Sequence, residues 1–219
     1  MRHPIISMVK AVCKHIGVRV YVCNTPGSSF GEYDPGERLL TLYPTYTRPK
    51  GRRRGKRRIE TVPEHEYLAT AVHELTHALQ DYRGDSDFHH EVSDYVLHYA
   101  EGTNHYPREK LWESAMHTMR FEFEADMMAI NILQLFGVQF RINRAIHAAK
   151  AYACSYLVFA KTGIMPDYRV TSKWYRYFSS KPEFDVDVGT LNKLIEITRA
   201  NRDFSYTIWE GRKCIKSIW

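Results

Sequence analysis

The pentapeptide HELTH, residues 73–77, constrains this chain more than any other feature. On an α-helix, residues i and i+4 share a face, so His73 and His77 can direct ring nitrogens at one ion. Glu74 lies between them and can reach a water molecule beside that ion. The pattern is typical of a hydrolytic zinc site in which Glu74 is the general base, although a helix can also carry two surface histidines for no purpose. If the zinc interpretation holds, another part of the chain must supply a third ligand.

A helix of about residues 63–82 is predicted to carry the pentapeptide. Thr61 would cap its N-terminus, and Glu64, three positions later, would complete a capping box. One face of the helix suits packing against a sheet and consists of Leu68, Val72, Leu75 and Leu79. The histidines share the other face with small residues that would let a second element approach, namely Ala69, Thr70 and Thr76. Ordinary surface histidines would more naturally lie among Lys and Glu, so this setting favours metal binding.

A second predicted helix, about residues 108–136, offers the third ligand. Hydrolytic zinc usually takes three protein ligands and leaves its fourth position for water. A projection of this helix places Glu122 on an inward face among alanines and Glu124 on the outward face. A carboxylate among alanines is expensive to bury without a cation. Asp126, one turn further on, would accept the remaining N–H of either ligand histidine and fix its orientation.

Two alternatives to this ligand set stay open. His89 and His90, twelve and thirteen residues after His77, would give a three-histidine site, but their acidic and polar surroundings favour a loop or a substrate-contacting rim. Alternatively, Glu122 and Asp126 would form a buried ion pair with an arginine or a polar stripe on the helix surface.

The whole chain, residues 1–219, is predicted to form one domain, because 219 residues are enough for one substantial core and few for two. The N-terminus lacks the uninterrupted apolar run and cleavage site of a signal peptide, and no segment approaches the roughly 18 apolar residues of a membrane span. The four cysteines lie far apart without a CxxC pair, at Cys13, Cys23, Cys154 and Cys214. These features favour a soluble, cytoplasmic protein without a membrane partner.

The remaining elements predict an α+β fold, with a small N-terminal β-sheet packed on the HExxH helix and a mainly helical C-terminal part. Strands are expected at residues 18–24 and 37–44, with GEYDPGE as the turn between them. Residues 83–107 are expected to be irregular around a short helix at 92–99. Further helices are expected at residues 5–16, 139–161 and 189–200, and the tail from Phe204 resembles a terminal hairpin.

The segment Arg48–Arg58 carries eight of the 31 basic residues and accounts for the net charge of +6. Its glycines predict a flexible loop. Such a run binds phosphates in a salt-dependent way without sequence specificity, and it can equally be a solvated loop without a ligand. The residues that would contact nucleic acid are Arg52, Arg53, Arg54, Lys56, Arg57 and Arg58.

The order hairpin, HELTH helix, then a helix with E-x-x-A-D at residues 122–126 resembles minimal gluzincins, members of the zincin fold. Together with the segment GEYDPGERLLTLYP it looks most like the ImmA/IrrE-type metallopeptidases, while HELTHALQ also looks like SprT-type proteases. The resemblance covers about residues 18–135. It implies intracellular cleavage of a protein partner, often a regulator bound to DNA. The chain departs from both groups in its basic insertion and in its helical tail after Gly137, and it lacks the cysteine zinc ribbon that SprT-type proteases commonly add.

These observations predict a zinc-dependent endopeptidase that holds one Zn²⁺ per chain through His73, His77 and Glu122, with a protein or peptide as substrate. Glu74 would take a proton from water and deliver it to the leaving amine. A further donor would stabilise the oxyanion, with candidates on the next helix at Tyr152, Tyr156 and His147. The alternatives are a SprT-like protease that acts on DNA-bound proteins and a non-catalytic zincin-fold protein that binds nucleic acid through residues 48–58.

Overall fold

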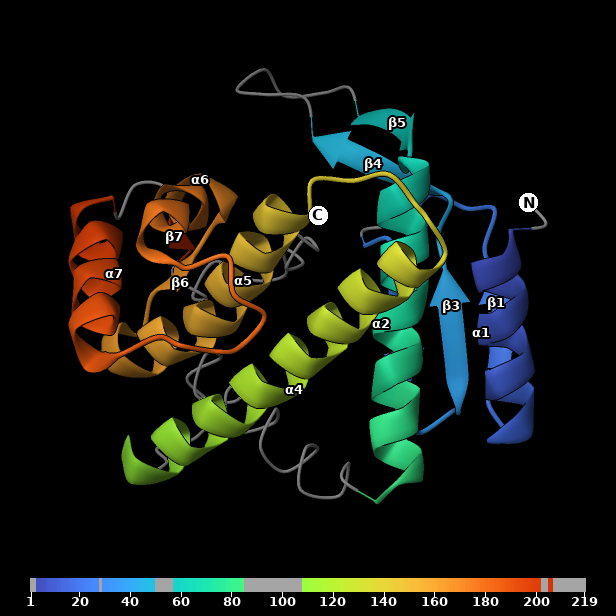
Figure 1. Cartoon of the computed structure of the whole chain (residues 1–219), viewed down its shortest axis with the longest axis horizontal. Helices are drawn as coiled ribbons and strands as arrows, with labels where there is room; N and C mark the ends of the chain where they lie inside the picture. The colour runs from blue at the N-terminus through green and yellow to red at the C-terminus, as the bar shows by residue number, and fades with distance from the viewer. Residues whose placement is uncertain (1–2, 28, 50–56, 85–107, 202–204, 207–219) are drawn as a thin grey trace.

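The computed structural model describes residues 3–27, 29–49, 57–84, 108–201 and 205–206, and within them the fold is α+β, mostly helical, with a small mixed sheet (Figure 1). The helix that carries HELTH, α2 (Glu64–Tyr82), lies between the sheet and the long helix α4 (Arg108–Leu135). The predicted α+β class is therefore confirmed, with a small N-terminal sheet and a mainly helical C-terminal part.

The sheet contains three strands in the order β1-β3-β2, comprising β1 (Arg19–Val22), β2 (Gly31–Asp34) and β3 (Leu39–Leu42). Strand β1 is parallel to β3, and β2 is antiparallel to it. Helix α1 (Pro4–His15) and helix α2 both pack against this sheet and close one hydrophobic core with it. The predicted helix and two strands near the N-terminus are confirmed, but GEYD, expected as part of a turn, is strand β2.

A second, two-stranded sheet leads into α2 and consists of β4 (Thr45–Pro49) and β5 (Arg57–Thr61). The prediction of a loop over residues 48–58 is wrong at both ends, because Arg48 pairs with Arg58 and Pro49 with Arg57. Residues 50–56 lie outside the described part. Thr61 does not cap α2, because it pairs with Thr45 in the ladder, and the helix begins after Pro63 without a side-chain cap.

Helix α2 is buried on nearly all sides. Its apolar face is confirmed, with Leu68, Val72 and Leu75 at most 5% exposed. On the neighbouring side β2 approaches closely: a Cβ added at Gly31 would come within 2.8 Å of Thr70 Cγ2. Only glycine lets the strand pack so tightly on the helix. The sheet therefore lies directly beside the turn of α2 that precedes His73.

Helix α4 packs against α2 and against α5 (Ile142–Thr162). Gly137 and Gly163 follow these two long helices with φ values of 68° and 69°, so the predicted glycine stops are confirmed. The pair α4 and α5 forms the centre of the C-terminal part. Their facing sides bring Glu122, Tyr152 and Tyr156 together, which matters for the site.

The remaining elements cover the outer side of α5, namely β6 (Met165–Pro166), α6 (Tyr168–Thr171), the 3₁₀ helix η1 (Ser172–Tyr177), α7 (Val188–Ala200) and β7 (Ser205–Tyr206). Lys150, which is 0% exposed, anchors this layer through Asp185 Oδ1 at 2.5 Å and the Ser179 carbonyl at 3.1 Å. Strand β7 pairs with β6; the rest of the expected terminal hairpin, residues 207–219, lies outside the described part.

No helix in the described part of the chain is both long and apolar enough to cross a membrane. The short helix expected at residues 92–99 falls outside the described residues.

Candidate metal centre

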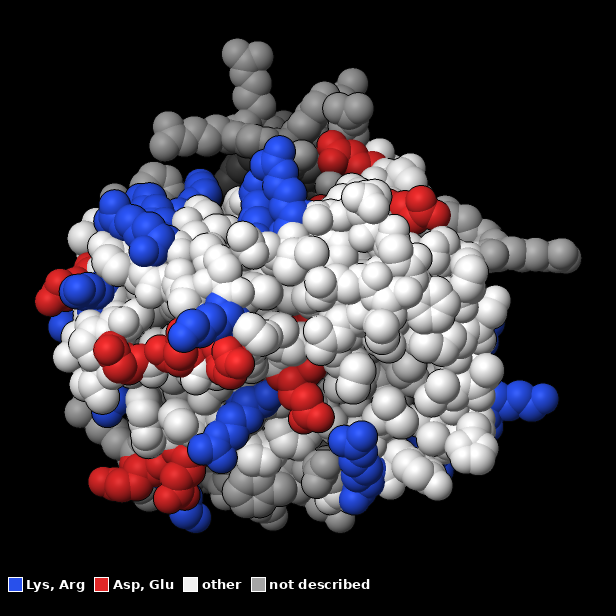
Figure 2. All heavy atoms as spheres, viewed as in Figure 1, with Lys and Arg blue, Asp and Glu red and all other residues white. Residues whose placement is uncertain are grey.

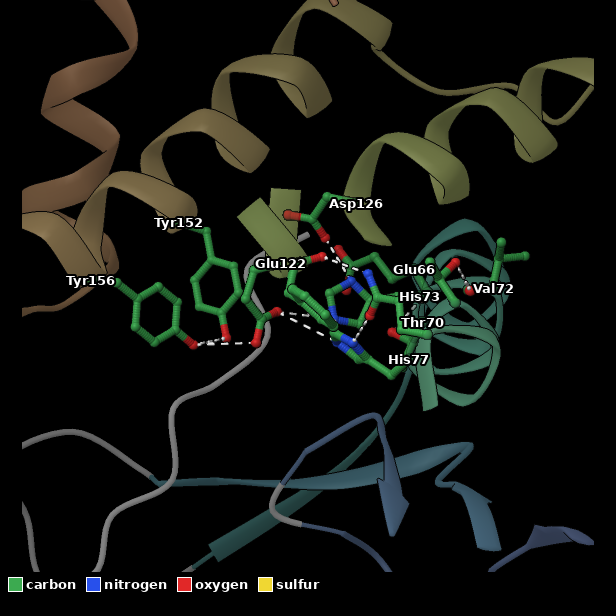
Figure 3. A network of polar contacts seen from close by, with 12 residues as sticks. Glu66, Thr70, Val72, His73, His77, Glu122, Asp126, Tyr152 and Tyr156 are labelled. Carbon is green, nitrogen blue, oxygen red and sulfur yellow. Dashed lines mark hydrogen bonds and ion pairs between the residues drawn. The ribbon is translucent and has the colours of Figure 1, made fainter. Parts of the chain in front are cut away.

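Three potential ligand atoms from two helices converge on one point (Figure 3). His73 Nε2 and His77 Nε2, one helical turn apart on α2, lie 3.0 Å from each other. Glu122 Oε2, from α4, lies 3.3 Å from His73 Nε2 and 3.6 Å from His77 Nε2. The structure therefore brings together the three residues that the sequence predicted as metal ligands.

The other nitrogen of each ring is already engaged. His73 Nδ1 lies 2.8 Å from Asp126 Oδ1, and His77 Nδ1 lies 2.8 Å from Gln80 Oε1. A carboxylate and an amide oxygen accept hydrogen bonds, so each Nδ1 of a neutral ring carries the proton and donates. Both Nε2 atoms then present lone pairs at a separation of 3.0 Å. Such an arrangement is repulsive unless a proton or a metal ion lies between them.

The carboxylate of Glu122 adds a third lone pair without a hydrogen. Among the described residues, its Oε2 is a buried atom that accepts no hydrogen bond. Burial alone would raise the pKa of this carboxyl group, but the adjacent histidines outweigh burial and hold it well below its usual value. Glu122 is therefore an anion that faces the two histidines, as a metal ligand must be.

The separations fit zinc. Two ligand atoms at a Zn–N distance of about 2.05 Å and a tetrahedral angle lie about 3.3 Å apart. The three separations in this site are 3.0, 3.3 and 3.6 Å. Two imidazoles and one carboxylate are also a donor set that catalytic zinc uses, and three protein ligands leave a position free. The residues present thus fit a hydrolytic zinc ion.

Protonation competes with metal binding at the histidines. Burial lowers the pKa of His73, but its hydrogen bond to Asp126, its contact with Glu122 and the charges of both carboxylates dominate and raise it well above the usual value. The pKa of His77 is also raised, because Glu122 outweighs burial there. The pocket therefore stabilises positive charge at the point where the Nε2 atoms meet.

Glu74 lies half-buried in the same turn of α2. Burial raises the pKa of its carboxyl group, and the nearby histidines only partly oppose that effect. The Tyr33 backbone N–H of strand β2 also opposes this rise in the pKa of Glu74. A raised pKa suits a carboxylate that takes and returns a proton near neutral pH.

Tyr156 and Tyr152 extend the site along α5. Tyr156 Oη donates to Glu122 Oε1 at 3.4 Å and lies 2.9 Å from Tyr152 Oη. Burial, followed by the charge of Glu122, raises the pKa of both phenols well above the usual value, so both remain neutral donors. The third predicted oxyanion donor, His147, lies 3.2 Å from Ser180 Oγ and packs on Tyr175 instead.

Gln80 is the site residue that the sequence analysis missed. It is 2% exposed and contacts both α2 and α4. A signal was present, because residue i+3 from His77 lies one turn further along the same helix face. A buried neutral amide has to find hydrogen-bond partners within the protein, and a ligand histidine is one.

The other candidate residues lie apart from this centre or outside the described part. Glu124 is exposed, as expected, and its Oε1 lies 3.7 Å from Arg83 Nη1. His89, His90, Arg52, Arg53, Arg54 and Lys56 lie outside the described residues, and Arg57 and Arg58 belong to β5. On the face in Figure 2, the basic side chains of the described residues alternate with acidic ones around a broad uncharged area.

Comparison with known protein families, with curated proteins and with solved structures found no match to this chain.

Proposed function

We propose that this protein is a zinc-dependent endopeptidase. The observation that carries the proposal is the convergence of three hydrogen-free donor atoms, on His73, His77 and Glu122, next to the half-buried carboxylate of Glu74. A structural zinc site gains nothing from such a carboxylate, and it usually closes the fourth position with another protein ligand. The arrangement is therefore better suited to hydrolysis than to a structural role.

The protein holds the ion and moves the proton. His73, His77 and Glu122 would hold one Zn²⁺, which when bound polarises a carbonyl group and lowers the pKa of water to about 7. Glu74 takes a proton from the attacking water, because burial raises the pKa of its carboxyl group and so increases its affinity for a proton. The same carboxyl group then returns the proton to the leaving amine, and the peptide bond is cleaved.

Strand β2 supports a polypeptide substrate. Among the described residues, β2 pairs with β3 along one edge, and no strand of that part of the chain pairs with its other edge. The backbone N–H of Tyr33 on β2 lowers the pKa of Glu74, so the strand runs near the proposed catalytic carboxylate. Tyr33 Oη also donates to Asp81 Oδ2 at 2.6 Å and ties the strand to the end of α2. An extended peptide that added to this edge would carry its backbone past Glu74.

The zincin-like fold and the ImmA/IrrE-type relationship belong to this proposal. The order of sheet, HELTH helix and glutamate helix agrees with them. An intracellular setting is consistent with the three described cysteines, Cys13, Cys23 and Cys154, which are free thiols. The alternatives, a SprT-like protease or a non-catalytic nucleic-acid-binding protein, differ in the third ligand and in the role of Glu74.

The Glu74→Gln variant tests the proposal. Gln keeps the size of the side chain but takes up no proton, so we expect full zinc content and a loss of peptide cleavage of about 100-fold or more. Cleavage is measured on a library of unfolded polypeptides with zinc-loaded protein, and zinc by elemental analysis. Wild-type protein that binds zinc but cleaves no member of the library, or a variant that retains full cleavage, would contradict the proposal.

A further inference from the structure

Gln80 has three polar contacts that the proposed mechanism does not use. Its Oε1 lies 2.8 Å from His77 Nδ1, and its Nε2 lies 3.3 Å from the Phe121 carbonyl and 3.1 Å from Glu124 Oε2. The side chain is almost completely buried, so these contacts satisfy it within the protein. One amide thus joins a ligand histidine of α2 to the backbone of α4.

The partners of Gln80 determine which way its amide faces. A backbone carbonyl and a carboxylate are acceptors, so the NH₂ group must face Phe121 and Glu124. The amide oxygen therefore faces His77 and can only accept. It follows that His77 Nδ1 carries the hydrogen and that Nε2 of the neutral ring carries a lone pair.

The same contacts reach the third ligand. Phe121 directly precedes Glu122, and its carbonyl is held by the amide that orients His77. A shift of α4 along α2 would therefore break the Gln80 contacts at the same time as it moved Glu122. The two histidines are oriented differently: His73 by the carboxylate of Asp126 from α4, and His77 by a neutral amide from its own helix.

We propose that Gln80 is a positioning residue of the metal centre, which fixes His77 as an Nε2 ligand and couples its orientation to the backbone beside Glu122. This inference rests on the proposed zinc function. The neutral amide of Gln80 supplies a hydrogen-bond acceptor without adding a further negative charge to a site that already contains Glu74, Glu122 and Asp126. Removal of a residue that orients a metal ligand typically weakens metal affinity about 10- to 100-fold.

The test uses the full-length protein and three variants. Gln80→Met has a similar size but no acceptor, and we expect its zinc dissociation constant, measured by chelator competition, to rise about 10- to 100-fold. Glu113→Ala is the matched control, because it removes an exposed glutamate of the same helix α4, and its zinc affinity should stay near that of the wild type. The variant Gln80→Glu keeps an acceptor for His77 but loses the donor to the Phe121 carbonyl, so its zinc affinity should lie between those of Gln80→Met and the wild type.

A spectroscopic readout separates positioning from packing. Long-range ¹H–¹⁵N spectra of the zinc-loaded wild type should show His77 bound through Nε2 with a slowly exchanging Nδ1–H, and Gln80→Met should show faster exchange of that hydrogen. Zinc affinity and exchange unchanged in Gln80→Met would overturn the proposal. If that variant does not fold, the wild-type spectrum alone decides, since ligation through Nδ1 or a rapidly exchanging Nδ1–H would also overturn it. Wild-type protein without zinc affinity would instead reject the proposed function itself.

Discussion

His73 Nε2 and His77 Nε2 face each other at 3.0 Å, while the opposite nitrogen of each ring donates a hydrogen bond to a buried acceptor. The two rings are nearly perpendicular, with an interplanar angle of 84°. Their lone pairs therefore converge from two directions, and Glu122 supplies a third. This geometry needs a cation to be stable, and it leads directly to predictions about which residues retain it.

We expect Glu122→Ala to lose zinc and Glu124→Ala to keep it. The two residues lie on the same turn of α4, but only Glu122 faces the histidines. Loss of a charged ligand from a three-ligand site should reduce zinc affinity by more than about 100-fold, which exceeds the effect of an outer partner. Zinc content after dialysis, together with circular dichroism as a check of folding, measures this difference.

A double alanine variant at His89 and His90 serves as the comparison for the third ligand. It should retain one zinc per chain if Glu122 is the ligand. If zinc disappears in that variant and persists in Glu122→Ala, the site has three histidines and is closer to the SprT-like alternative.

Tyr156→Phe distinguishes two roles of the phenol. Its hydroxyl donates to Glu122 Oε1, so we expect it to hold the Glu122 carboxylate in position for the metal ion. Removal of one hydrogen bond of about 0.5–1.5 kcal/mol should weaken zinc binding about 2- to 12-fold and leave kcat at saturating zinc nearly unchanged. An oxyanion donor would behave in the opposite way, with kcat reduced about 10²- to 10³-fold and zinc affinity unaltered. Tyr152→Phe, one hydroxyl further from Glu122, should have the smaller effect on zinc.

The main features of the site could be predicted because they follow from helical periodicity. His73 and His77 share a face by their spacing, and Glu122 differs from Glu124 in the face it occupies. Periodicity also placed Asp126 one turn beyond Glu122, although it could not decide which histidine it would contact. The structure assigns it to His73.

The features that were missed depend on tertiary contacts. The i+3 spacing places Gln80 on the helix face of His77, but its contacts with the Phe121 carbonyl and Glu124 on another helix follow from no local pattern. The segment GEYD contains residues typical of turns, yet it forms β2, because Gly31 allows the close approach to Thr70 and the strand pairs with β3. Thr61 has the residue type of an N-cap, but pairing in β5 commits its backbone to a strand.

The close approach of Gly31 to Thr70 can be tested by two substitutions, one at each residue. In Gly31→Ala the new Cβ would lie 2.8 Å from Thr70 Cγ2 and 3.1 Å from Leu42 Cδ2, so β2 must move away from α2. We expect a loss of stability of about 1–3 kcal/mol, as for other overpacked positions, and reduced cleavage because the edge strand shifts. Urea unfolding measures the first effect, and kcat/KM the second.

Adding Thr70→Ser to Gly31→Ala should restore part of the stability, since Ser keeps the hydroxyl bond to the Glu66 carbonyl and removes the clashing methyl group. Thr70→Ser alone is the control and should change stability little. Equal losses in the single Gly31→Ala variant and in the double variant would show that Thr70 does not limit the approach of β2.

Away from the metal centre, the carboxyl group of Asp185 should make the stability of the protein depend on pH. Hydrogen bonds from Lys150 and then Ser179 lower the pKa of its carboxyl group. A carboxyl group whose pKa is lowered on folding stabilises the protein above its unfolded pKa of about 3.9, and this contribution disappears as the pH falls through the folded value. Asp185→Asn should therefore be destabilised at pH 7 and become more similar to the wild type as the pH falls below about 4.

The size of the effect at pH 7 is set by Lys150. Its side chain is 0% exposed, and the substitution removes the carboxylate with which its ammonium group forms an ion pair. Two contacts to Ser179 remain, and Asp185 itself is 38% exposed, so solvent screens part of the interaction. We expect a loss of about 1–2 kcal/mol, measured as the difference in urea midpoints between variant and wild type. Glu183→Gln, an exposed site two residues earlier, is the control for the general effect of removing a negative charge. A difference between Asp185→Asn and wild type that stays constant down to pH 3 would argue against this ion pair as the source of the pH dependence.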